Sequence, residues 1–258
     1  MWAAAPHDGR DYCTANEALA DAVAHAARLT RGDYVLSLAC GAGEELRRWT
    51  THFGAAEVLG VERDARRAQL ARVSSASNIR VVTASAWDRV ATPGTFDVVL
   101  CLDAAYHMSP RSDFLSAAHA ALKPGGRLAF TDLVLADASP PSTALRLGAV
   151  LCGVQAGDLC SVEGQQKRLR DAAFERGACT PLDDAVLGGF ARFVAHQRRL
   201  LGRTVWHPAW WRPAITARLI APMRAGGLGY ALFSASKGAT GRAASSGSGV
   251  AGAGTGPM

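Results

Sequence analysis

The first half of the chain alternates short apolar runs with segments in which apolar residues recur every three or four positions. The apolar runs predict five strands, at 34–39, 57–61, 79–83, 96–102 and 127–131. The intervening patterns predict helices at 14–29, 44–53, 64–73 and from Ser109-Pro110 to just before Pro124. This alternation is typical of βα units around a parallel sheet. Right-handed crossovers then place the carboxyl ends of the strands at one edge, where ligands bind in such sheets.

The pattern changes after Asp132. About ninety residues with helical periodicity precede the next clear strand pattern, at 230–236, and they predict helices at roughly 142–157, 162–175, 184–201 and 208–224. An insertion of this kind beside the ligand edge is typical of a lid or a substrate wall. We therefore expect one domain over 1–237 with a helical lid at about 138–225. The Gly/Ala/Ser-rich segment 238–258 is predicted to be a disordered tail.

Composition fits one compact α/β domain, because 258 residues with 49% hydrophobic residues can bury a single core of that type. The net charge of +6 is concentrated after Pro141, where fourteen Lys and Arg face six Asp and Glu. These arginines are scattered through amphipathic patterns without interleaved aromatic residues. This distribution favours a solvated face and makes nucleic acid an unlikely partner.

The six cysteines form no C-x-x-C pair and no Cys/His cluster at zinc spacing, so no metal site is expected. The N-terminus lacks a basic segment followed by an apolar one, and no apolar stretch reaches the ~18 residues of a membrane span. We expect a cytoplasmic protein with no membrane span.

A glycine-containing loop follows the first predicted strand. Gly41 and Gly43 allow the backbone to approach a ligand closely, and Glu62 ends the second strand nineteen positions after Gly43. A carboxylate at that place can accept hydrogen bonds from both ribose hydroxyls of a nucleoside. The spacing therefore predicts a cofactor that contains adenosine.

The start of the following helix discriminates between such cofactors. A loop that binds a diphosphate has a third glycine where this chain has Leu46, preceded here by Glu44 and Glu45. Two carboxylates there repel a diphosphate, whereas the sulfonium and ammonium of S-adenosyl-L-methionine meet no such repulsion. The prediction is therefore S-adenosyl-L-methionine rather than NAD(P).

With these motifs, the sequence resembles the class I S-adenosylmethionine-dependent methyltransferases, within the small-molecule branch that includes sugar O-methyltransferases and quinone C-methyltransferases. The resemblance covers about Tyr12 to Lys237 and is carried by 36–43, 61–64, 96–100 and 122–127. It implies an α/β, Rossmann-like, mostly parallel seven-stranded sheet with helices on both faces, a last antiparallel strand and a helical lid after the fifth strand. It also implies cofactor contacts from Tyr12, Ala39, Cys40, Gly41, Gly43, Glu62, Arg63, Ser85, Ala86 and Asp103.

The chain departs from the family pattern at two places. Ser37 and Ala39 stand where the family usually has an acid and a glycine, and Ala84-Ser85 stands where it often has Gly-Asp. Loss of the second carboxylate removes one acceptor for the adenine amine, although Ser85 can still accept a hydrogen bond.

The segment after the fourth strand carries the candidate catalytic residues. His107 can accept a proton from a substrate hydroxyl, since an imidazole with an unperturbed pKa of about 6.5 suits a base near neutrality. Asp132, at the tip of the fifth strand, would orient it, as the resemblance to sugar O-methyltransferases also implies. Alternatively, His107 only shapes the pocket, because methyl transfer to a good nucleophile needs positioning more than a base.

The substrate is expected to be a small organic molecule, methylated on oxygen, nitrogen or carbon and in part apolar or aromatic. Tyr106 and His107 would line its pocket, and a cluster of indoles in the lid could add an aromatic side: Trp206, Trp210 and Trp211. Three alternatives stay open at this point. They are an RNA or protein methyltransferase, an NAD(P)-binding oxidoreductase and a non-catalytic cofactor-binding protein.

Overall fold

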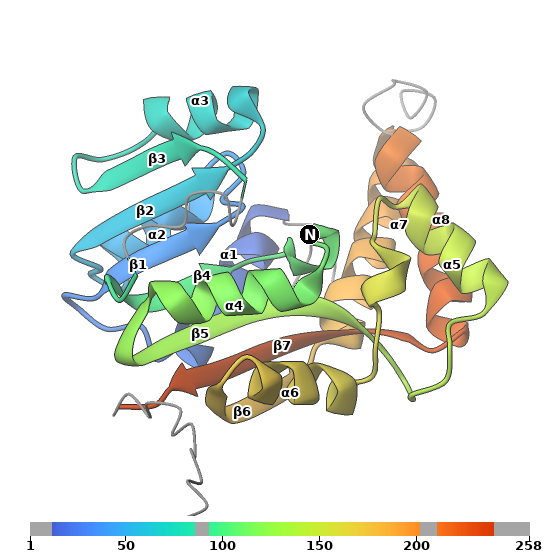
Figure 1. The fold of residues 1–258 in the computed structure, drawn as a ribbon. Coiled ribbons are helices and arrows are strands. Elements are labelled where there is room, and N and C mark those ends of the chain that lie inside the picture. Colours follow the sequence, from blue (N-terminus) through green and yellow to red (C-terminus); the bar gives the residue numbers. More distant parts are fainter. Residues whose placement is uncertain (1–11, 86–92, 202–210, 240–258) are drawn as a thin grey trace, which may run out of the picture.

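A computed structural model describes residues 12–85, 93–201 and 211–239. Its centre is a seven-stranded sheet in the order β3-β2-β1-β4-β5-β7-β6 (Figure 1). The strands are β1 (Tyr34–Leu38), β2 (Glu57–Glu62), β3 (Ile79–Thr83), β4 (Phe96–Cys101), β5 (Leu122–Leu135), β6 (Phe174–Pro181) and β7 (Leu228–Lys237). Only β7 runs antiparallel to its neighbours, β5 and β6. The predicted Rossmann-like, mostly parallel fold is confirmed.

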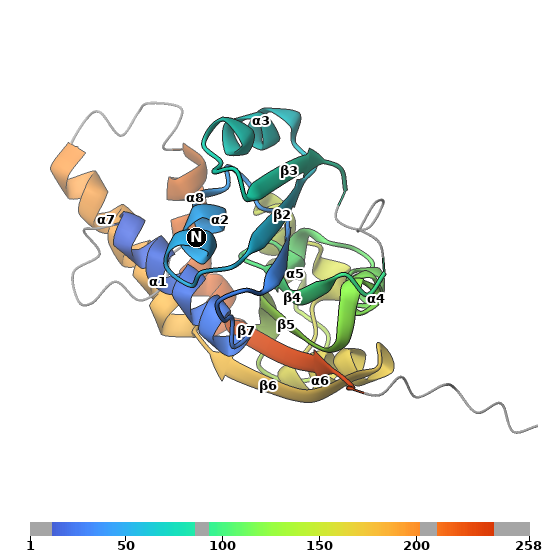
Figure 2. The ribbon, with the colours of Figure 1, turned by 90° about the vertical axis from the view of Figure 1, so that its left-hand side faces the viewer.

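Helices cover both faces of this sheet (Figures 1 and 2). Neighbouring residues of β1 point to opposite faces: Val35 packs with α1 (Tyr12–Ala26), α2 (Glu44–Thr51) and α3 (Ala65–Val73), while Leu36 packs with α4 (Arg111–Ala121) and α6 (Val162–Asp171). Strands buried on both faces are expected to be almost continuously apolar, which is why their sequence pattern was clear.

The helices of the second half form a separate layer at one end of the sheet: α5 (Thr143–Leu151), α7 (Gly189–Leu201) and α8 (Trp211–Ala225), at the right of Figure 1. Two short elements, η2 (Ala156–Asp158) and η3 (Asp184–Gly188), belong to the same part of the chain. Leu145, Leu187 and Met223 from this layer share a core with Leu19 of α1 and Tyr230 of β7. In the described ranges, no helix has the length and apolarity needed to cross a membrane.

One strand of the sheet was missed from the sequence. The predicted helix at 162–175 ends at Asp171, and β6 follows at the edge of the sheet, inside the segment predicted to be a helical lid. Within β6 only Phe174 is buried, and most of the other side chains are exposed. An edge strand with one buried residue has no alternation of apolar and polar positions to reveal it.

Candidate active site

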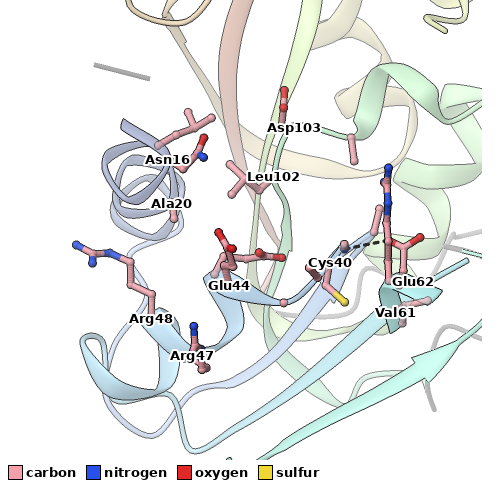
Figure 3. Close-up of a pocket in the computed structure, with 18 of the residues that line it drawn as sticks. Asn16, Ala20, Cys40, Glu44, Arg47, Arg48, Val61, Glu62, Leu102 and Asp103 are labelled. Carbon is pink, nitrogen blue, oxygen red and sulfur yellow. Dashed lines mark hydrogen bonds between the residues drawn. The ribbon is translucent and has the colours of Figure 1, made fainter. Parts of the chain in front are cut away.

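A cavity of about 1190 Å³ opens at the carboxyl ends of β1, β2, β3 and β4 (Figure 3). Its wall includes nine of the ten predicted cofactor residues: Tyr12, Ala39, Cys40, Gly41, Gly43, Glu62, Arg63, Ser85 and Asp103. The tenth, Ala86, lies outside the described residues. Two of the predicted substrate residues, Tyr106 and His107, line the same cavity. The fold thus brings the two predicted groups to one place.

Glu62 is a buried carboxylate, 5% exposed, at the end of β2. Its Oε2 accepts a hydrogen bond from the backbone N–H of Gly41 at 2.9 Å, and its Oε1 accepts one from that of Asp64 at 2.8 Å. Each carboxylate oxygen can accept more than one hydrogen bond. Glu62 is therefore held in a fixed orientation and keeps the capacity to accept further hydrogen bonds at the cavity wall.

The two glycines of the loop after β1 have different roles. A Cβ built on Gly41 would meet no atom within 4 Å, so this backbone faces open space in the cavity wall. A Cβ on Gly43 would lie 2.9 Å from the Cβ of Ala71 in α3, so this glycine permits close packing of two helices. Both residues have a positive φ, 55° and 80°, which favours glycine.

Ser85, just after β3, has a buried hydroxyl oxygen with no hydrogen-bond partner among the described residues. A buried polar group without a partner is uncommon and indicates a missing ligand or water. An adenosine-containing molecule therefore fits this cavity. Its wall offers the open backbone at Gly41, the fixed carboxylate of Glu62 and the Ser85 hydroxyl without a partner.

Two further acids, Glu44 and Glu45, begin α2 at the cavity wall. Burial, together with the charges of Glu44 and Glu62, raises the pKa of Glu45 to about 8. Arg48 of α2 also lines the cavity, but it is bound to Asp21 of α1, with 2.6 Å between Nη2 and Oδ2. A cation in the cavity would relieve the repulsion among these carboxylates, which agrees with the predicted preference for a sulfonium cofactor.

Asp103 follows β4 with a positive φ of 54° and accepts hydrogen bonds on one oxygen, Oδ1, from two phenols. The hydroxyl of Tyr106 lies 2.6 Å from it and that of Tyr230 2.9 Å. Burial, followed by the charge of Asp103, raises the pKa of Tyr106, which stays a neutral donor. This network fixes the backbone that leads into the next turn.

His107 is the last residue of that turn, η1 (Ala105–His107), and its Nδ1 lies 2.6 Å from the carbonyl oxygen of Gly153. A carbonyl oxygen only accepts hydrogen bonds, so Nδ1 carries the proton. In the neutral ring, Nε2 then holds the free lone pair. Gly153 belongs to the segment just after α5, so the helical layer orients the ring.

The expectation that Asp132 orients His107 is wrong. Asp132 is 2% exposed, does not line the cavity and binds Arg111, with 2.8 Å between Oδ2 and Nε. The reason is that Arg111, the first residue of α4, is itself buried, and a buried guanidinium needs a carboxylate. The carbonyl of Gly153 takes the orienting place instead.

The indole cluster does not form a cavity wall in the part of the chain that the structure describes. Trp211 is 56% exposed at the start of α8 and is not among the lining residues. Trp206 and Trp210 lie outside the described residues.

Several lining residues were not foreseen, notably Asn16 and Ala20 of α1 and Arg47 of α2 (Figure 3). Asn16 and Ala20 are four positions apart and thus share a helix face, but that spacing is equally typical of a buried face. Met108, after η1, also lines the cavity.

A family model described as a methyltransferase domain matches residues 35–126, from β1 into the start of β5. An erythromycin 3''-O-methyltransferase of Saccharopolyspora erythraea is 32% identical over 172 residues, which are 62% of this chain and 56% of that protein. A 27-O-demethylrifamycin SV methyltransferase of Amycolatopsis mediterranei is 33% identical over 164 residues, 61% of this chain and 59% of that protein. This chain thus spans less than two thirds of the length of the curated relatives it matches.

Among solved structures, the cyclopropane synthase MmaA2 of Mycobacterium tuberculosis has the same fold, with a TM-score of 0.75. The alignment covers 92% of this chain and 89% of that one, at 16% identity. The family model, the two relatives and this fold agree with the motifs that carry the resemblance. Residues 35–126 therefore match a methyltransferase domain, and the described chain has the fold of MmaA2.

Proposed function

We propose that this protein transfers a methyl group from S-adenosyl-L-methionine to a hydroxyl of a small organic molecule, and that His107 accepts the hydroxyl proton. The observation that carries the proposal is the hydrogen bond of 2.6 Å between His107 Nδ1 and the Gly153 carbonyl. It leaves Nε2 as the basic nitrogen of a ring that lines the same cavity as Glu62.

The loop after β1 and the ends of β2 and β3 would hold the cofactor. Glu62 accepts hydrogen bonds from the ribose hydroxyls, Ser85 is available to the adenine, and the Gly41 backbone leaves room for the methionine part. When bound, S-adenosylmethionine supplies an electrophilic methyl group, which the acceptor oxygen takes while the carbon–sulfur electron pair stays on sulfur. The proton released by that oxygen goes to Nε2 of His107.

The rest of the cavity suits an acceptor with an apolar part. Leu19, Leu102, Tyr106 and Met108 line the same cavity as His107. An apolar wall positions the acceptor and excludes water from the reacting groups, which supplies much of the acceleration in such reactions.

Both curated relatives support this choice, because each is named as a methyltransferase of an antibiotic and one name specifies an oxygen acceptor. The fold by itself does not decide the reaction, since the structural neighbour MmaA2 is a cyclopropane synthase.

The test is a screen of hydroxylated small molecules with a donor that carries an isotopically labelled methyl group, read by mass spectrometry. We expect a product that gains one labelled methyl group, and a loss of about 10²- to 10⁴-fold in turnover for His107→Ala with unchanged affinity for S-adenosylhomocysteine. Equal losses of turnover and affinity would make His107 a binding residue. If calorimetry shows binding of a nicotinamide dinucleotide but of neither S-adenosylmethionine nor S-adenosylhomocysteine, the proposal is wrong.

A macromolecular acceptor is the alternative that the sequence left open, and the names of the two relatives, both methyltransferases of small molecules, do not favour it. Tight binding of tRNA that weakens steeply with added salt would support it over the small-molecule proposal.

A further inference from the structure

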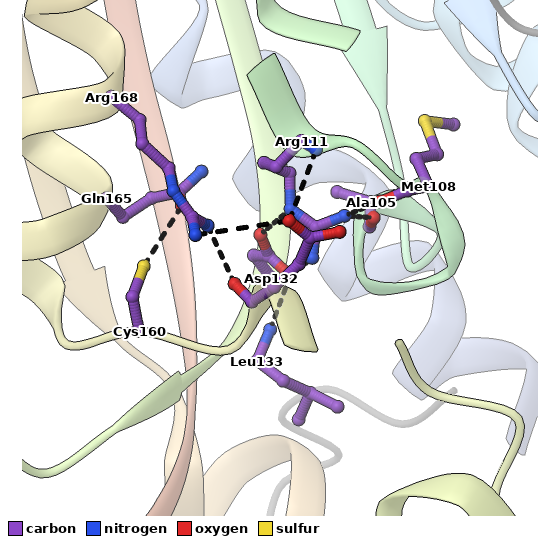
Figure 4. Close-up of polar contacts among 9 residues, drawn as sticks. Ala105, Met108, Arg111, Asp132, Leu133, Cys160, Gln165 and Arg168 are labelled. Atoms are coloured by element: carbon purple, nitrogen blue, oxygen red, sulfur yellow. Dashed lines mark hydrogen bonds and ion pairs between the residues drawn. The ribbon is translucent and has the colours of Figure 1, made fainter. Parts of the chain in front are cut away.

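Arg111 is the most buried cationic side chain that the structure describes, at 1% exposed. Its Nη1 donates hydrogen bonds to the carbonyl oxygens of Ala105 and Met108 (Figure 4). These two residues enclose the turn η1 and its last residue, His107. One guanidinium nitrogen therefore binds both ends of the turn that carries the proposed base.

Asp132 fixes the other side of the same guanidinium. Its Oδ1 accepts a hydrogen bond from Nη2 at 3.2 Å. Its Oδ2 lies 2.8 Å from Nε, an ion pair without hydrogen-bond geometry. Asp132 Oδ1 also accepts the backbone N–H of Leu133 at 2.9 Å. The contact thus ties the turn to β5.

A second set of contacts holds the turn from the helical layer. The carbonyl of Tyr106 accepts the N–H of Gln155 at 3.1 Å, and His107 binds the carbonyl of Gly153. The turn therefore lies between Arg111 on one side and the segment 153–155 on the other. If Arg111 is removed, that segment and the hydrogen bond from Tyr106 to Asp103 still hold the turn.

Stability alone does not account for this arrangement. Taking two charges out of water costs free energy that their attraction recovers only in part, and buried ion pairs are often replaceable by apolar residues. The guanidinium of this pair donates hydrogen bonds to both ends of η1, the turn that carries His107. The pair is therefore better explained as a means of orienting that turn.

We propose that Arg111, anchored by Asp132, is a positioning residue that sets the orientation and the tautomer of His107. The proposal rests on the proposed function for its catalytic consequence, but not for the orientation itself. Asp132 keeps a role in the reaction through Arg111, in place of the direct contact with His107 that the sequence suggested.

The first experiment needs no acceptor. Nitrogen-15 NMR of histidine-labelled protein, with His107 assigned from the His107→Ala spectrum, reports which ring nitrogen carries the proton. We expect the Nδ1–H tautomer in the wild type. In the double variant Arg111→Met/Asp132→Leu, which removes both charges and leaves neither unpaired, the two nitrogen signals should move toward the average of both tautomers.

The matched control is another Arg–Asp pair, Arg127 and Asp33. Their side chains lie 2.7 Å apart at the amino ends of the parallel strands, away from the cavity. The double variant Arg127→Met/Asp33→Leu should leave the His107 signals unchanged. Should the first double variant not fold, Arg111→Lys keeps a charge beside Asp132 but cannot bind both carbonyls and the carboxylate together, and it should shift the signals in the same direction. Unchanged His107 signals in a folded Arg111 variant would overturn the proposal.

The second experiment measures turnover with the acceptor found above. The Arg111→Met/Asp132→Leu variant should lose about tenfold or more in turnover at unchanged affinity for S-adenosylhomocysteine. The same double change made in the His107→Ala variant should cause little further loss, because residues that act through one another are not additive. Full additivity would overturn the proposal. If no acceptor is ever methylated, the proposed function fails, while the NMR result still decides the role of Arg111.

Discussion

The carboxylate of Glu62 and the backbone amide of Gly41 lie 2.9 Å apart, and their hydrogen bond joins the end of β2 to the loop after β1. The second carboxylate oxygen binds the amide of Asp64, whose own side chain caps α3 by accepting the N–H groups of Arg66 and Arg67. One buried acid thereby organises three segments of the cavity wall.

Replacement of Glu62 should therefore weaken cofactor binding strongly. We expect Glu62→Ala to raise the Kd for S-adenosylhomocysteine by about 10- to 100-fold, because hydrogen bonds to a charged group contribute about 1.5–3 kcal/mol. Isothermal titration calorimetry measures this change. The control is Glu57→Ala, an exposed acid at the other end of β2, which should bind as the wild type does. Wild-type affinity in Glu62→Ala would exclude the ribose contact.

Much of the fold followed from the sequence for a physical reason. Strands such as β1 and β4 are buried on both faces, so their apolar runs were unambiguous. The edge strand β6 was missed because its side chains are mostly exposed. The position of the cavity also followed, since parallel strands with right-handed crossovers place their carboxyl ends together.

The partners of individual side chains did not follow from the sequence. The sequence predicted that Asp132 lies at the tip of the fifth strand and His107 just after the fourth, so a direct contact was a reasonable inference. In the structure Asp132 lies inside β5 and His107 in η1. Whether they meet depends on Arg111, which comes from the start of α4, and on Gly153, which comes from the layer of α5. Such contacts depend on tertiary packing that no local pattern records.

The role of the Gly153 carbonyl can be tested through its backbone conformation. Gly153 has a φ of 72°, and a Cβ added there would lie 3.8 Å from Cε1 of His107. Alanine in this left-handed backbone conformation costs about 1–2 kcal/mol, so Gly153→Ala should shift the carbonyl and lower turnover several-fold.

The control is Gly125→Ala, because Gly125 has a similar φ of 77° and open space where a Cβ would lie. Steady-state kinetics and thermal unfolding of both variants would separate strain from catalysis. Equal turnover in the two would show that the carbonyl does not orient the base.

The raised pKa of Glu45 predicts a pH dependence of stability. Because the folded protein holds this proton up to about pH 8 and the unfolded chain releases it near 4.5, the folded state binds more protons between these values. The free energy of unfolding should therefore fall as pH rises through this window. Glu45→Gln, which cannot ionise, should lose less stability over the same range. Denaturant titrations at several pH values between 5 and 9, spaced about one pH unit apart, measure this difference. Parallel pH curves for the two proteins would contradict the raised pKa.

The same group should couple cofactor binding to proton release. A cation in the cavity favours the charged form of Glu45, so binding of S-adenosylmethionine expels its proton and the affinity should rise with pH up to about 8. Calorimetry in buffers of different ionisation enthalpy counts the protons released. Glu45→Gln serves as the control, because it removes this contribution and retains any titration of the cofactor itself. An unchanged proton count in the variant would place the cofactor cations away from Glu45.

Tyr12 and Phe193 connect the first described helix to the helical layer. Their ring centroids lie 5.4 Å apart, and Tyr12 lines the cavity while Phe193 belongs to α7. If Tyr12 covers the methionine part of the cofactor, Phe193→Ala should remove an aromatic contact that contributes about 0.5–1.5 kcal/mol. The Kd for S-adenosylhomocysteine should then rise about two- to tenfold. The effect should appear mainly as faster dissociation, because loss of a covering contact changes the off-rate more than the on-rate. Stopped-flow displacement measures that rate. Leu200→Ala, an exposed position on the same helix, is the matched control and should dissociate at the wild-type rate. If Phe193→Ala also does so, α7 does not hold Tyr12 over the cofactor, and the first helix closes the cavity without help from the helical layer.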